Sequence, residues 1–248
     1  MGSLPLASWA ERVELDQQLR VPEAPRLSRA LREAGLDFYF NSWRLLPANG
    51  IWGLGLVAIL VVPVGLIIAV ALLSLLAIPT AGIYRMAALI ARGDSVSLWD
   101  GLRAYRDHLG TALVMGVATM LLLAVLVFNV VNGLSQGTFV GFALATAAGW
   151  GLVFLVIFLV TAWPVLIDPR REDLTVRQRL RLAVLLMLAH PLRVGALAAV
   201  VVIITVVSTI LFAALVTVSV AYVALLSCRY VLPAADRLEG RATVPVEG

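Results

Sequence analysis

Three long stretches of the chain carry no charged side chain. Residues 45–84, 109–167 and 194–228 contain no Asp, Glu, Lys or Arg, so every charge of the protein lies outside them. A charge at the centre of a bilayer costs about 2.5 to 3.5 kcal/mol on insertion scales. These stretches are therefore predicted to lie in a membrane. A composition of 61% hydrophobic and only 14% charged residues argues against a soluble protein.

The length of each stretch predicts how often it crosses the bilayer. A helix of 40 residues, the length of the first stretch, would be about twice as long as the ~30 Å hydrocarbon core. The first stretch should therefore cross twice, with its break at Pro63 and Gly65. The second stretch should also cross twice, turning in the polar, glycine-containing segment 129–137.

The third stretch, residues 194–228, is long enough for two short passes or one tilted helix. Two passes keep Arg229, Arg237 and Arg241 on the same side as the other arginines, as the positive-inside tendency prefers. We therefore expect an all-α fold, a polytopic transmembrane bundle of six spans, with five as the alternative. An even number of spans places both termini on one side of the membrane, and the positive-inside tendency predicts that this side is the cytoplasm.

These spans define one membrane domain, residues 36–232, whose hairpins cover about 45–91, 109–167 and 194–228. Cytoplasmic tails are expected at 1–35, of which 1–25 are expected to be poorly ordered, and at 233–248. An amphipathic helix should precede each hairpin, which suggests a loose three-unit repeat. The first of these helices is expected at 28–34 and to end at Gly35.

The other two amphipathic helices show clearer spacing. Leu98, Leu102 and Tyr105 share one helical face, and Ser95 or Ser97 could cap the helix start. Residues 174–190 form the other helix, which has a basic face that contains Arg177 and Arg181. Both helices are predicted to lie at the cytoplasmic surface of the bilayer, where arginines are attracted to anionic lipids.

The sequence offers little material for catalysis. The charge-free stretches contain no carboxylate, lysine, arginine or histidine, and no phosphate-binding glycine loop or His-Glu-x-x-His motif occurs. Cys228 is the single cysteine, and His108 and His190 lack acidic or thiol companions that would make a metal site. We therefore expect no enzyme, no cofactor and no bound metal. The net charge of +4 comes from arginine alone, which suggests a GC-rich genome rather than nucleic-acid binding.

Two patterns concern contacts between helices. Small residues recur every fourth position and predict a helix-packing stripe; they are Gly137, Gly141, Ala145 and Gly149. Hydroxyl groups gather at Thr205, Ser208 and Thr209. These hydroxyls are expected to bond between helices, with the lining of a solute path as the alternative reading.

Short motifs along the chain resemble one family of bacterial membrane proteins. They are Asn49-Gly-Ile-Trp52, Ile78-Pro79-Thr-Ala-Gly82-Ile-Tyr84, Arg92-Gly-Asp, Trp163-Pro with Asp168, and His190-Pro. Their order and spacing are similar to those of the YesL-like family, over roughly residues 36–235. The motif positions in this chain are Asn49, Trp52, Pro79, Gly82, Tyr84, Arg92 and His190.

The resemblance implies a modest function. YesL-like proteins have no established enzymatic activity and are often encoded beside ABC-type carbohydrate uptake systems. The expected function is an accessory or assembly component associated with carbohydrate transport, with the lipid bilayer and another membrane protein, such as an ABC transporter, as partners. The rival hypothesis is an autonomous transporter or channel for a neutral small solute.

Overall fold

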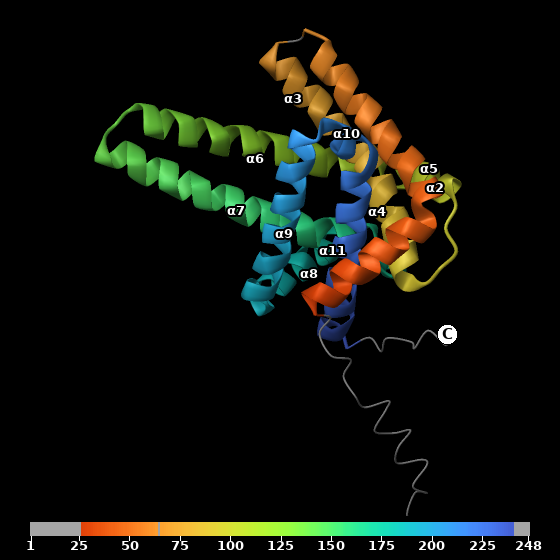
Figure 1. Ribbon diagram of the computed structural model, residues 1–248. Helices are drawn as coiled ribbons and strands as arrows, with labels where there is room; N and C mark the ends of the chain where they lie inside the picture. The colour runs from red at the N-terminus through yellow and green to blue at the C-terminus, as the bar shows by residue number, and fades with distance from the viewer. Residues whose placement is uncertain (1–25, 64, 241–248) are drawn as a thin grey trace, which may run out of the picture.

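The structure, a computed structural model, describes residues 26–63 and 65–240, and every described element is a helix (Figure 1). Six helical stretches in this part are long and apolar enough to cross a membrane. They confirm the expected all-α fold and six spans, and residues 191–238 supply two of the six. The predicted disordered tail, residues 1–25, and Arg241 lie outside the described residues.

In the described residues, eight α-helices and one π-helical turn form the spans. Two further α-helices precede the second and the third hairpin. In chain order the described elements are α2 (Leu27–Val61), α3 (Leu66–Leu75), α4 (Ala77–Arg92), α5 (Leu98–Asp107), α6 (Leu109–Ser135), α7 (Phe139–Ile167), the 3-10 turn η1 (Pro169–Arg171), α8 (Val176–Ala189), α9 (Pro191–Ile210), α10 (Phe212–Ala214), the π-helical turn η2 (Leu215–Ser219) and α11 (Val220–Leu238).

The spans form three hairpins that diverge from a common base. Each hairpin has an outer tip where two helices meet. The tips include Val62, Pro63 and Gly65 after α2, residues 136–138 between α6 and α7, and Leu211 after α9. In Figure 1 the hairpin of α6 and α7 projects away from the other helices, whereas α9 and α11 run side by side. The opposite ends of the hairpins meet where α4, α7 and α11 finish.

Local chemistry explains two of the tips. Pro63 and Gly65 separate α2 from α3, at the predicted break. Gly137, at φ 62°, adopts the left-handed conformation between α6 and α7. The tip of α6 and α7 is at the end of the predicted segment, because Asn129 and Ser135 bond carbonyls of their own helix and do not interrupt it.

Helices α5 and α8 begin with capping boxes. The backbone N–H of Ser97 donates to the Asp100 carboxylate at 2.8 Å, which selects Ser97 over Ser95 as the cap. Thr175 and Gln178 form the equivalent box at α8. Both helices occur where the amphipathic spacing predicts them, and α8 buries Leu182, Ala183 and Leu186.

The prediction of a short helix ending at Gly35 is wrong. Helix α2 runs through Gly35 without interruption to Val61, crossing the boundary expected between tail and membrane domain. Ala30 and Ala34 are buried, and Asp37 pairs with Arg229 of α11 at 2.6 Å. These contacts outweigh the ~1 kcal/mol that a glycine costs inside a helix. Helix α11 likewise continues beyond the expected boundary at 232, as far as Leu238.

The α6–α7 hairpin is held together near its tip by glycine. A Cβ atom on Gly133 would lie 2.5 Å from the carbonyl oxygen of Gly141 and 3.0 Å from the backbone nitrogen of Ala145. Gly133→Val should therefore force the two backbones apart and destabilise the protein by about 1–3 kcal/mol. Thermal unfolding in detergent measures this loss. Gly149→Val is the matched control, because no atom lies within 4 Å of its Cβ position, and equal losses in both variants would contradict the prediction.

Candidate functional site

A cluster of buried charges joins the ends of the three hairpins. Arg92 at the end of α4 and Arg171 of η1 bind Asp168, which follows α7, and Asp236 of α11. The side chains of Arg171 and Asp168 are fully buried, and those of Arg92 and Asp236 are only 6% and 4% exposed. We call these four residues, together with Glu239, the charge cluster.

The hydrogen bonds of the charge cluster are multiple and short. Arg92 Nη2 lies 2.6 Å from Asp168 Oδ2 and 3.1 Å from Asp236 Oδ1. Arg171 Nη2 lies 2.6 Å from Asp236 Oδ1, and its Nε donates to Glu239 at 3.1 Å. Each guanidinium therefore bridges carboxylates from different helices. Such pairing is what allows ionised groups to be buried.

The sequence around Asp168 explains how the charge cluster forms. Helix α7 stops at Ile167, and Asp168 then adopts an extended backbone that Pro169 requires of the preceding residue. The carboxylate of Asp168 accepts from the backbone N–H of Arg170 and caps the 3-10 turn. This turn brings the Arg171 guanidinium back onto the Asp168 carboxylate, three residues earlier.

Two further arginines donate to carbonyls at the end of α7 that have no donor within the helix. Arg179 of α8 donates to the carbonyl of Leu166 at 2.7 Å, and Arg85 of α4 donates to that of Ile167 at 3.3 Å while pairing with Glu172 at 2.6 Å. The last carbonyls of a helix lack intrahelical donors, so these contacts satisfy them and match the negative end of the helix dipole. Partial burial lowers the pKa of the Arg179 guanidinium without depriving it of its charge at neutral pH.

The charge cluster serves to hold helices together. Arginine remains protonated in proteins, so Arg92 and Arg171 act as fixed positive charges that pair with the two carboxylates. The contacts among the four buried members join guanidinium groups to carboxylates. The arrangement fixes α4, α7 and α11 relative to one another.

Two motif positions of α2, Asn49 and Trp52, make hydrogen bonds to other helices. The fully buried Asn49 amide donates to the carbonyls of Leu215 and Val216 in η2 at 3.3 and 2.7 Å and accepts from the N–H of Ala221 at 2.9 Å. Trp52 donates through its indole N–H to Thr80 of α4 at 3.1 Å. Pro79 lies in the first turn of α4, where a missing N–H is tolerated.

The remaining motif positions lie on α4 and at the start of α9. Gly82 lets α4 approach α5, since a Cβ atom there would lie 2.7 Å from the Gly101 carbonyl. Tyr84 stacks on Trp163 of α7 with ring centroids 5.7 Å apart, and Arg92 belongs to the charge cluster. His190 lines a separate cavity at the start of α9. The structure thus distributes the motif over several helix contacts.

Only part of the predicted packing stripe is in contact. Gly141 lies against Gly133, and the buried Ala145 also meets Gly133. Gly137 is outside the helix, at the tip, and neither Gly137 nor Gly149 has an atom within 4 Å of its Cβ position. The contact of small residues therefore covers about one turn of α7 and involves Gly133, which the spacing rule did not include.

Four hydroxyl groups of the third hairpin bond within their own helical segments. Thr205 donates to the carbonyl of Val201 at 2.8 Å, and Thr209 donates to that of Thr205 at the same distance. Thr217 and Ser219 do likewise in α10 and η2. These bonds differ from the expected bonds between helices, because a threonine in an apolar helix reaches its own i−4 carbonyl more readily than a neighbouring helix.

The two histidines occupy separate places. His108 ends α5, where partial burial and the neighbouring Arg85 lower the pKa of its imidazole below the ordinary value. Among residues 26–63 and 65–240, no three His, Cys, Asp or Glu side chains gather as a metal site would require.

Comparison with protein families, with curated proteins and with solved structures gives no match to this chain.

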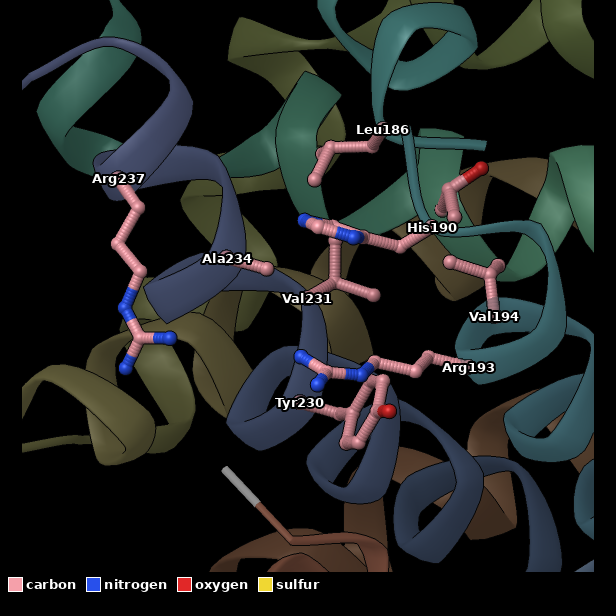
Figure 2. A pocket seen from close by; sticks show the side chains of 9 residues that line it. Leu186, His190, Arg193, Val194, Tyr230, Val231, Ala234 and Arg237 are labelled. Carbon is pink, nitrogen blue, oxygen red and sulfur yellow. The ribbon is translucent and has the colours of Figure 1, made fainter. Parts of the chain in front are cut away.

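A basic cavity lies beside the charge cluster, between the ends of α8, α9 and α11. Its volume is about 210 Å³, and Figure 2 shows His190 and Arg193 reaching from α9 towards Val231 and Tyr230 of α11, with Arg237 at the far side. Leu186, Val194 and Ala234 supply apolar walls, and Thr161 of α7 completes the lining. We call this space the basic cavity.

Proposed function

We propose that the protein is a non-catalytic, multi-pass component of a bacterial inner membrane that assists the assembly or operation of a transport system. The observation that carries the proposal is the use of its buried polar groups. The four buried charges pair with one another, and Asn49 binds the η2 turn. Four hydroxyl groups of the third hairpin, those of Thr205, Thr209, Thr217 and Ser219, bond carbonyls of their own helical segments. Polar groups used in this way hold the shape of the protein and are not free to bind a substrate.

The projecting α6–α7 hairpin supplies a surface for a partner inside the membrane. Its outer part exposes large apolar side chains from both helices, among them Phe128, Phe139 and Phe142. A second membrane protein could pack its helices against this hairpin without displacing any contact of the rest of the molecule. The resemblance to YesL-like proteins supports an ABC-type carbohydrate uptake system as that partner.

Affinity purification from the native host in mild detergent tests the accessory role. The full chain, tagged at its C-terminus, should copurify with subunits of an ABC transporter. Phe142→Ala and Phe128→Ala, which shorten exposed side chains of the hairpin, should reduce that recovery, whereas Phe212→Ala at another tip should not. Recovery of the chain without any transport subunit would remove the main support for this proposal.

We also propose that both termini face the cytoplasm, because six spans return the chain to the side on which it began. Reporter fusions at residue 1 and residue 248 test this topology, and reporters on opposite sides would overturn it. The expectation rests on the excess of arginine at the base of the hairpins.

One observation favours the second candidate, transport of a neutral solute. A cavity of about 340 Å³ lies between α2, α4, α6 and α7, with apolar walls and the Trp52–Thr80 pair as polar groups. Apolar pockets with a few placed polar groups are typical of small-molecule sites. Solute flux into proteoliposomes containing only this protein would support transport, and absence of flux for sugars and polyols would leave the accessory role.

A further inference from the structure

The strongest unassigned feature is a seam along α7 and α9 that is basic at one end and apolar along its length. The basic cavity forms one end of the seam. A second hollow of about 520 Å³ continues along the same two helices and is lined almost wholly by carbon. We propose that this seam binds an anionic phospholipid, with the headgroup phosphate in the basic cavity and an acyl chain in the apolar groove.

The two hollows are consecutive on both helices. Thr161 lines the basic cavity and Ile157 lines the groove, four residues earlier on α7. Val194 and Ala198 stand in the same relation on α9. Residues four apart share one face of a helix, so the groove begins where the basic cavity ends.

The charges around the basic cavity suit a phosphate. Arg193, His190 and Arg237 line it, and no Asp or Glu is among its lining residues. Arg193 is exposed and forms no ion pair with any residue in the described part of the chain, so its guanidinium can offer a bidentate contact. The Tyr230 hydroxyl lies beside it as a further donor.

Small residues keep the groove open. Gly195, Ala198 and Ala199 of α9 face Val153 and Ile157 of α7 across it, where larger side chains would close the space. An acyl chain needs such a smooth, apolar and elongated surface, whereas a soluble anion gains nothing from it.

The rim of the basic cavity places it at the membrane surface. Leu188 and Leu192, on either side of His190, are 68% and 88% exposed. Apolar side chains so exposed next to arginines are typical of the interface, where lipid tails and headgroups meet. This combination favours a lipid over free phosphate as the occupant.

Native mass spectrometry of the delipidated full chain tests the proposal. Phosphatidylglycerol and phosphatidylcholine with identical acyl chains are added separately, and the fraction of lipid-bound protein is measured. The wild type should retain phosphatidylglycerol about tenfold better than phosphatidylcholine. Arg193→Gln should remove most of this preference, while Arg193→Lys, which keeps the charge, should preserve part of it.

Two further variants distinguish recognition of the headgroup from binding of the acyl chain and from general electrostatic attraction. Ala199→Phe should reduce retention of both lipids severalfold, because it fills the groove. Arg181→Gln, on an exposed site of α8 outside both hollows, removes an equal charge and should leave the preference unchanged. Thermal unfolding of each variant shows that it is folded.

Several results would overturn the proposal. Equal loss of preference in Arg181→Gln and Arg193→Gln would show non-specific attraction to the basic surface. Stabilisation of the protein by inorganic phosphate as large as that by phosphatidylglycerol would show a soluble anion site. If the wild type does not prefer phosphatidylglycerol, the lipid proposal is wrong, and an acidic segment of a partner protein becomes the alternative occupant of the seam.

Discussion

Replacement of Arg171 by leucine is expected to lower the stability of the protein by about 3–5 kcal/mol, because it leaves the carboxylates of Asp168 and Asp236 buried with one guanidinium between them. For a chain of this size the loss corresponds to a decrease of roughly 10 °C in the midpoint of thermal unfolding. Light scattering or size-exclusion chromatography after heating in detergent measures the midpoint.

Arg177→Leu is the matched control for this variant. Arg177 lies six residues further along, is exposed, and takes no part in the charge cluster. Its replacement should change stability by about 0.5 kcal/mol or less. If both variants unfold at the same temperature, the charge cluster does not fasten the hairpins.

A double variant distinguishes lost attraction from unbalanced charge. Arg171→Leu combined with Asp236→Leu leaves Arg92 and Asp168 as a balanced pair at 2.6 Å. Apolar replacement of both partners of a buried ion pair is often nearly neutral, so the double variant should be more stable than Arg171→Leu alone. If the double variant instead loses as much stability as Arg171→Leu and Asp236→Leu lose together, packing dominates over charge balance.

The number of spans could be predicted because it depends on a local rule. Any segment without charges and longer than a bilayer is thick must turn, and Pro63, Gly65 and Gly137 mark two of the turns in the sequence. The capping box of Ser97 and Asp100 is equally local, since both residues lie within one helical turn. Each of these features is decided by neighbours in the chain.

The charge cluster could not be predicted by the same reasoning. Insertion costs apply to a single charge and place Arg92, Asp168 and Asp236 outside the membrane, in contact with water. In the structure Arg92 is neutralised by Asp168 and Asp236, which lie 76 and 144 positions further along the chain. The sequence carried a signal for one member only, because Asp168 directly follows the second uncharged stretch.

The tip of the third hairpin, at Leu211, could not be predicted from neighbouring residues either. Leu211 lies between Ile210 and Phe212, and no glycine, proline or asparagine marks a turn there. Its break depends on a distant residue, Asn49, whose amide binds the carbonyls of η2. The sequence identified Asn49 only as a motif position, since the contact spans 166 residues or more.

Asn49→Leu should therefore destabilise the third hairpin. A π-helical turn leaves carbonyl oxygens without their usual i+4 donors, and Asn49 supplies two bonds to them and accepts one from Ala221. Leucine of similar size leaves these three backbone groups without partners in an apolar environment. We expect a loss of about 3 kcal/mol, since each unsatisfied buried group costs about 1–3 kcal/mol and the turn can relax in part.

Hydrogen exchange locates this loss, which thermal unfolding alone cannot. Amides of residues 211–221 should exchange faster in Asn49→Leu, because the π-helical turn opens without its side-chain partner. Asn129→Leu is the matched control: its exposed amide donates only to the carbonyl of Val125 in its own helix, so neither stability nor exchange at 211–221 should change. Unaltered exchange at the turn in Asn49→Leu would mean that α9 and α11 form their hairpin without help from α2, and that the motif asparagine has another purpose.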